Sequence, residues 1–139
     1  MDEGGADLRR RLPSFMHEYS SLAEVLADRG LASLGDAYVN LVYSLALSKI
    51  SGKPVGRKLD SLTLASALRK SDMRGFLPGR VDRHGQADAA EALIVYGWLS
   101  GAVSIWEAVE ILAREGEIVE NLSELLKLTL RRLSFKESV

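Results

Sequence analysis

The chain contains no cysteine, which excludes disulfide bonds, thiolate metal sites and cysteine nucleophiles. An intracellular, cytoplasmic protein is therefore expected rather than a secreted one. The N-terminal stretch MDEGGADLRRRLPSF has no apolar core segment, which argues against a signal peptide. The longest apolar run, residues 37–50, is too short to span a membrane and is interrupted by Asn40, Ser44 and Ser48. No membrane association is expected.

The sequence also lacks the sustained alternation of polar and apolar residues that predicts β-strands. An apolar share of 47% and a charged share of 27% are typical of one soluble globular domain of this length, 139 residues. We predict an all-α domain of five to seven helices over residues 1–139, with 1–13 and 134–139 as candidates for disorder. The helical spacing covers residues 14–29, 34–50, 59–71, 87–100, 104–116 and 119–133.

Several helix starts carry capping signals. Ser21 with Glu24, and Ser104 with Glu107, have the spacing of a capping box. Asp60 or Ser61 is expected to cap the helix that follows it. Residues 72–85 are rich in glycine, proline and charge, and are expected to form a loop.

Charge is unevenly distributed, although the net charge is only −1. Eight basic residues face three acidic ones between Lys53 and Arg83, whereas six glutamates face one arginine between Glu107 and Glu124. The basic middle of the chain favours a surface that binds an anion. The alternative is two solvated surfaces without any ligand.

Two helices, 34–50 and 87–100, are apolar nearly all round and begin with small residues. Helices of that kind are buried, and small residues let two backbones approach closely. We therefore predict that these two helices pack against each other. The small residues are Gly35 and Ala37 in the first helix and Ala87, Ala89, Ala90 and Ala92 in the second.

Asp36, Asp88 and Glu91 are the only acids in those two helices. Asp88 and Glu91 are three residues apart and share a helix face. Asp36 begins a polar stripe that repeats every four residues, at Asn40, Ser44 and Ser48. If the helices cross near their N-terminal ends, the three carboxylates converge and need a cation, for which Mg²⁺ or Mn²⁺ is suited.

A simpler interpretation is that these acids belong to helix starts. Asp88 and Glu91 have capping-box spacing, and Asp36 follows a glycine at the expected beginning of its helix. The arginines of the 72–85 loop are also available as counter-charges in place of a metal.

The segment LGDAYVNL, residues 34–41, resembles the signature of the ribonuclease III family. ADAAEALIVYGWLSG, residues 87–101, resembles the second acidic helix of that family, in the same order and at a similar separation. The resemblance implies an all-α, dimeric catalytic domain that cleaves double-stranded RNA with Mg²⁺. It also implies that Asp36, Asp88 and Glu91 are the metal-site carboxylates, with Glu91 as the principal ligand.

The chain departs from the signature at two positions. The family places glutamates four and seven residues before the aspartate, where this chain has Ala32 and Arg29. The compact Mini-III branch also lacks these glutamates, and it has a basic, glycine-containing loop before the second acidic helix. The chain therefore resembles that branch, and a small archaeal-type group, more than the full-length enzyme. The corresponding loop residues here, expected to contact RNA phosphates unless they only solubilise the loop, are Arg74, Arg80, Arg83 and His84.

Three hypotheses about function follow. The first is a metal-dependent endoribonuclease that acts on structured or double-stranded RNA as a homodimer. The second is a catalytically degenerate dimer that binds RNA or assists assembly, with the Arg29 guanidinium in the place of the metal. The third is an all-α interaction protein whose acids are helix caps. In every case Trp98 and Trp106 are expected in the core or a dimer interface.

Overall fold

The computed structural model describes residues 12–16, 18–133 and 135, and within these ranges the regular structure is entirely helical. The all-α prediction is therefore confirmed. None of the described helices is long and apolar enough to cross a membrane. The ends 1–13 and 134–139, predicted as candidates for disorder, lie almost wholly outside the described residues. The elements are α1 (Leu22–Ala27), α2 (Arg29–Ser51), α3 (Ser61–Lys70), the 3₁₀ turn η2 (Arg74–Phe76), α4 (Arg83–Leu99), α5 (Ile105–Leu112) and α6 (Ile118–Arg132).

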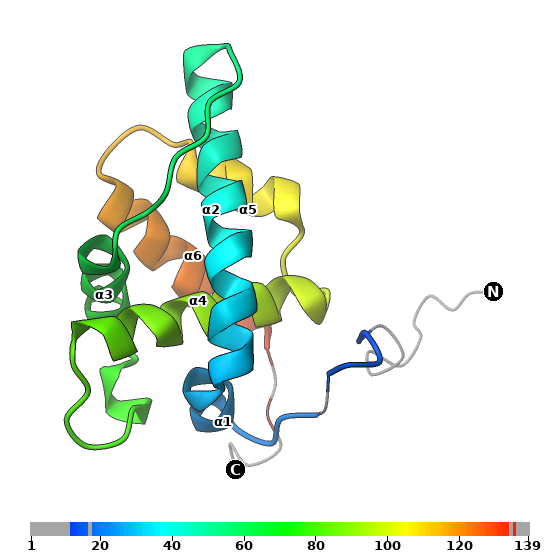
Figure 1. Ribbon diagram of the computed structural model, residues 1–139, viewed down its shortest axis with the longest axis vertical. Coiled ribbons are helices and arrows are strands. Elements are labelled where there is room, and N and C mark those ends of the chain that lie inside the picture. Colours follow the sequence, from blue (N-terminus) through cyan, green and yellow to red (C-terminus); the bar gives the residue numbers. More distant parts are fainter. Residues whose placement is uncertain (1–11, 17, 134, 136–139) are drawn as a thin grey trace.

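Helix α4 is the centre of the fold (Figure 1), and it contacts α1, α2, α3 and α6. Every residue from Ala89 to Gly97 is buried, so α4 has no solvent-facing stripe along that stretch. The long helix α2 crosses α4 and covers one side of it. The core is closed by apolar side chains of the surrounding helices, chiefly Val25, Val39, Val42, Leu64, Leu68, Val109, Leu122, Leu125 and Leu126.

The crossing of α2 and α4 confirms the predicted packing of the two apolar helices. At Gly35 the backbones approach so closely that an added Cβ would lie 2.2 Å from the main-chain oxygen of Glu91. Only glycine fits at such a distance, because any side chain would overlap the facing helix. The contact lies toward the N-terminal half of α2, next to Asp36.

The start of α2 differs from the sequence prediction. The helix begins at Arg29, not near residue 34, and the Asp28 carboxylate caps it by accepting a hydrogen bond from the Leu31 amide at 2.9 Å. Asp28 also accepts a 2.5 Å hydrogen bond from the Tyr19 hydroxyl, and the Tyr19 ring packs edge-to-face on Tyr96. These tertiary contacts hold the preceding chain outside a helix, so the predicted helix 14–29 is reduced to α1.

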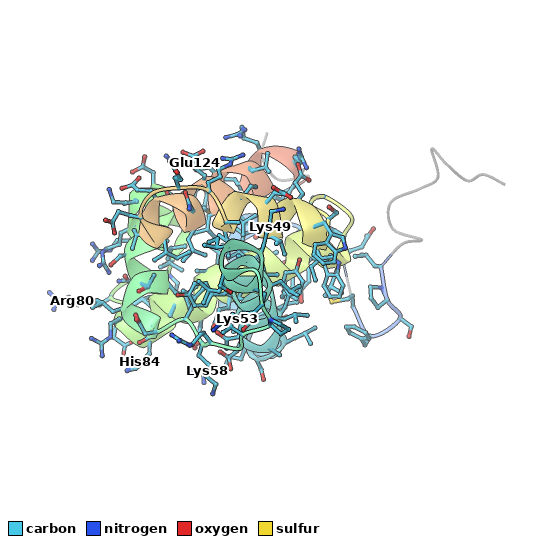
Figure 2. All side chains as sticks on the ribbon, turned by 90° about the horizontal axis from the view of Figure 1, so that it is seen from above. Lys49, Lys53, Lys58, Arg80, His84 and Glu124 are labelled. Atoms are coloured by element: carbon cyan, nitrogen blue, oxygen red, sulfur yellow. The ribbon has the colours of Figure 1, made fainter. Side chains whose placement is uncertain are left out.

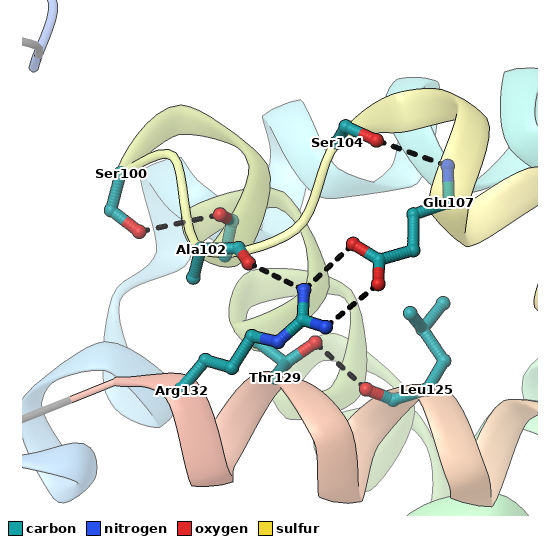
Figure 3. A network of polar contacts seen from close by, with 8 residues as sticks. Ser100, Ala102, Ser104, Glu107, Leu125, Thr129 and Arg132 are labelled. Atoms are coloured by element: carbon teal, nitrogen blue, oxygen red, sulfur yellow. Dashed lines mark hydrogen bonds and ion pairs between the residues drawn. The ribbon is translucent and has the colours of Figure 1, made fainter.

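The other boundaries follow the capping signals more closely. Ser21 and Ser104 accept hydrogen bonds from the amides of Glu24 and Glu107, each at 3.1 Å, and Asp60 caps α3. The Glu107 carboxylate, however, pairs with Arg132 at the end of α6. Arg132 also donates to the Ala102 carbonyl at 3.0 Å, so one guanidinium joins α6 to the α4–α5 connection (Figure 3).

An extended segment between α2 and α3, residues 53–60, is called the strap below; it runs back beside α2 (Figure 1). The hydroxyls of Ser48 and Ser44 each accept from the amide and donate to the carbonyl of one strap residue, Val55 and Arg57 respectively. The amide of Leu59 donates to the Asn40 side chain at 2.8 Å. The polar stripe of α2 is therefore a set of hydrogen-bonding groups for the strap.

The spacing of these contacts has a geometric cause. Four residues of α-helix rise about 6 Å, and two residues of extended chain rise about 6.6 Å. Polar groups repeating every four residues on α2 therefore match every second residue of the strap.

We expect Gly35→Ala to lower the free energy of unfolding by about 1–3 kcal/mol, because its Cβ forces α2 and α4 apart. Urea denaturation followed by circular dichroism measures the change. Gly56→Ala in the strap is the matched control, since nothing lies within 4 Å of an added Cβ there, and it is expected to change stability by less than about 1 kcal/mol. Equal stabilities for the two variants would contradict the close-contact interpretation.

Candidate active site

A cleft of about 480 Å³ opens where α2 crosses α4, beside the end of the strap and the start of α3. Helix α2 contributes one wall, α4 the opposite wall, and Leu59 and Leu64 part of the remainder. The polar side chains that line it are Arg29, Ser33, Asp36, Ser61, His84, Asp88 and Glu91. The three carboxylates singled out from the sequence therefore share one cleft.

None of these three acids caps its helix. Asp28 caps α2, so Asp36 stands two turns inside that helix. Asp82 caps α4 by accepting from the Gly85 amide at 2.9 Å, so Asp88 and Glu91 lie beyond its first turn. The interpretation of the acids as helix-start residues is therefore wrong for this fold.

The three acids differ in their surroundings. Glu91 is 6% exposed and lies beneath the helix crossing, whereas Asp36 and Asp88 are exposed at its edge. Asn40, one turn after Asp36, donates a hydrogen bond from its side-chain amide to the Asp36 carboxylate at 3.2 Å. The side-chain oxygen of Asn40 accepts a hydrogen bond from the Leu59 amide, so Asn40 connects Asp36 to the strap.

The buried position changes the acidity of Glu91. Its pKa is raised from 4.5 to about 8, first because burial penalises the charged form, and then because of a hydrogen bond with Asp36 and the charges of Asp36 and Asp88. No described basic group forms an ion pair with any of the three acids. A cation in the cleft would therefore relieve an unfavourable concentration of negative charge.

The four basic residues predicted to contact RNA lie between η2 and the first turn of α4. Arg74 lies on η2 and Arg80 on the loop after it, whereas Arg83 and His84 are in the first turn of α4. The predicted loop 72–85 therefore ends at Asp82. Only His84 of these four lines the cleft. Arg80 and His84 project from the same side of the molecule (Figure 2).

The family model of ribonuclease III matches residues 29–132, about three quarters of the chain. The chain belongs to the ribonuclease III family. A search of curated proteins finds no match. The matched region begins at the first residue of α2 and ends at the last residue of α6, so it includes both walls of the cleft.

The two departures from the ribonuclease III signature also lie in the cleft. Ala32 and Arg29 line it on the α2 side, where the resemblance places glutamates. Arg29 is exposed and forms no ion pair with Asp36 in the part of the chain that the structure describes. The Arg29–Asp36 pair that a metal replacement would require is therefore not formed.

The donor set suits a hard divalent ion, because three carboxylates line the cleft and none of them forms an ion pair with a described basic group. Within the described ranges, no group of three or more histidine and acidic side chains is arranged to hold a metal ion by itself. Mg²⁺ usually binds through one or two protein carboxylates together with water and substrate phosphates. The cleft fits that mode better than a closed protein cage.

The sequence pointed to the stripe Asp36–Asn40–Ser44–Ser48 but not to its use. The sequence predicts Asn40 as a polar residue in an apolar helix, and no local pattern predicts the strap that it holds. Ser33 and Ser61 also line the cleft and were not identified as candidates. The repeat every four residues was the available signal for Asn40.

In the absence of divalent ions, we expect stability to decrease as the pH rises from about 5 to 8. Folded Glu91, with its pKa near 8, retains a proton that the unfolded chain releases near pH 4.5, so ionisation favours unfolding across this window. Glu91→Gln removes this slope. Between pH 5 and pH 8, the free energy of unfolding is expected to fall by at least about 1 kcal/mol more in the parent than in Glu91→Gln. Urea denaturation in EDTA at several pH values tests this. Glu124→Gln, at an exposed position on α6, serves as control. Parallel profiles for parent and Glu91→Gln would refute the assignment.

Proposed function

We propose that this ribonuclease III family protein is a metal-dependent endoribonuclease that hydrolyses phosphodiester bonds in structured or double-stranded RNA. The observation that carries the proposal is the convergence of Asp36, Asp88 and Glu91 in one cleft, without a basic partner and beside exposed basic side chains. Helix caps would not be gathered in this way, because each helix already has its own cap in Asp28 or Asp82.

The residues divide the work by position. Glu91, Asp36 and Asp88 would hold Mg²⁺ or Mn²⁺, with Glu91 as the principal ligand. When bound, such an ion activates a water molecule for in-line attack and offsets charge on the leaving oxygen. Asn40 fixes the orientation of the Asp36 carboxylate by donating to it. Arg74, Arg80, Arg83 and His84 would contact the phosphates that flank the bond to be cut.

A second candidate function rests on Ala32 and Arg29. Both line the cleft where the family signature has acids, and the loss of two carboxylates weakens divalent-ion binding. On this basis the protein would be a catalytically degenerate dimer that binds RNA or assists assembly. The same two residues, with the basic segment before α4, favour the compact Mini-III-like or archaeal-type branch of the family.

We also propose a homodimer, because large apolar side chains are exposed along α2 and at the end of α4. Leu34 and Leu41 are 39% and 49% exposed and lie on either side of Tyr38, within one turn of it on α2. Trp98 is 40% exposed and stacks on Tyr38 with ring centroids 4.6 Å apart. A contiguous apolar strip of this kind marks an interaction surface.

The cleavage assay uses a radiolabelled RNA duplex with Mg²⁺ or Mn²⁺. The parent protein is expected to cut the duplex, and EDTA to abolish cutting. Glu91→Gln is expected to reduce the rate at least about 100-fold, because a metal ligand contributes several kcal/mol to the transition state. Glu124→Gln, which removes the same charge on the opposite side of the molecule (Figure 2), is the control. RNA binding without any cutting by the parent would reject the enzyme and leave the binding module.

Leu41→Glu is expected to convert the dimer to a monomer, because a charge in the apolar strip cannot be desolvated without cost. Sedimentation equilibrium across a range of concentrations measures the mass. Leu62→Glu on α3 is a matched control, since Leu62 is 55% exposed on another helix. A monomeric parent protein, or a dimer that survives Leu41→Glu unchanged, would disprove the assignment of this surface.

A further inference from the structure

We propose that the strap is a second RNA-binding surface, which holds phosphates of duplex RNA through Lys53, Arg57 and Lys58. This inference rests on the proposed function, because it concerns the RNA that the cleft would cut. The RNA phosphates that the strap would hold are distinct from the phosphodiester in the cleft, since the strap leads away from the three acids. The strap would add its phosphate contacts to those proposed for Arg74, Arg80, Arg83 and His84.

The strap has a fixed position although it is extended chain. Five hydrogen bonds of 2.8–3.2 Å join three of its residues to Ser48, Ser44 and Asn40 on α2. These contacts use main-chain groups of the strap, so its side chains are left available. A basic segment held in this way loses less conformational entropy on binding than a free loop would.

The positive charge of the strap is not neutralised locally. Lys53, Arg57 and Lys58 are exposed, and none forms an ion pair with an acid among the described residues. Asp60 is the one acid within the strap, and its carboxylate accepts from the Thr63 amide at 2.7 Å as the cap of α3. That hydrogen bond lowers the pKa of Asp60, so the carboxylate stays ionised. The carboxylate is directed toward α3 and not toward the strap cations. By contrast, Lys49 just before the strap is paired with Glu110.

The strap is continuous with the cleft at one end. Leu59 lines the cleft, and from there the hydrogen-bonded stretch extends back along α2 from Asn40 to Ser48. These residues are eight positions apart, a rise of about 12 Å. Seen from above, Lys58 and His84 lie on the side of the molecule away from Glu124, and Arg80 projects from the adjacent side (Figure 2). The strap cation Lys58 and the cleft residue His84 therefore lie on the same side of the protein.

A line of exposed cations suits a nucleic-acid backbone better than a single small anion. Lys53, Arg57 and Lys58 do not line the cleft, whereas a duplex presents phosphates at regular intervals along each strand. Duplex RNA is recognised largely through its shape and its backbone, which requires charges placed along a rigid surface. The strap supplies such a surface beside the candidate catalytic cleft.

The test compares two triple variants that remove equal charge. Lys53→Gln/Arg57→Gln/Lys58→Gln changes the strap but keeps its main-chain hydrogen bonds. Arg114→Gln/Lys127→Gln/Arg131→Gln is the control and alters residues of α6 and the turn before it, none of them in an ion pair with a described residue. Binding to a short RNA duplex is measured by fluorescence anisotropy in EDTA at several salt concentrations, which separates binding from cutting.

The strap variant is expected to bind RNA at least about tenfold more weakly at low salt, and to lose up to about three units of the slope of log affinity against log salt. The control is expected to change affinity less than about threefold, as a distant charge change does under screening. Circular dichroism should show that both variants are folded.

Equal losses for the two triple variants, or an unchanged salt slope in the strap variant, would overturn the proposal. If the parent protein bound RNA without cutting it, the proposed cleavage would fail while the same slopes still decided the role of the strap. If the strap variant lost binding to polyglutamate but not to RNA, the surface would belong to an acidic protein partner instead.

Discussion

The contact between Gly35 and the main chain of Glu91 determines the arrangement of the candidate site. It brings α2 and α4 together at the point where each helix carries an acid, so that Asp36 and Glu91 meet while the Glu91 side chain is buried. A wider crossing would leave the same residues apart and solvated. The high pKa of Glu91 is therefore a consequence of helix packing.

Helix α2 serves the fold on one face and the site on another. Its apolar face, including Val39 and Val42, packs into the core, while its polar stripe orients an acid at one end and holds the strap along the rest. One asparagine contacts both Asp36 and the strap. A shift in the strap would therefore be transmitted to the Asp36 carboxylate through a single side chain.

Much of this arrangement could be predicted from the sequence. The all-α fold, the pairing of two apolar helices and the convergence of three acids followed from helical periodicity and from small residues at the helix starts. The exact starts did not follow, because Gly30 and Gly85 lie in the first turns of α2 and α4, where glycine is usually unfavourable. Asp28 and Asp82 stabilise those turns as caps, so the helices extend past the expected boundaries and the acids of the site move inward.

The helix expected over residues 14–29 failed for a different reason. Its amphipathic pattern is real, but Tyr19 packs on Tyr96 and hydrogen-bonds Asp28, and these contacts connect residues far apart in the sequence. The strap could not be predicted either, because its partners on α2 are up to nineteen residues away along the chain. Local patterns describe elements well, but they do not describe contacts between elements.

Gly35 and Asp36, which are adjacent in the signature segment, are constrained in different ways. Gly35 is fixed by a steric limit on the main chain of α4, which applies whether or not a metal is bound. Asp36 is exposed and contributes little to packing. A protein of this fold could thus exchange the acid at little cost in stability, but it could not exchange the glycine. The glycine is therefore a requirement of the fold, whereas the aspartate is a requirement of the proposed chemistry alone.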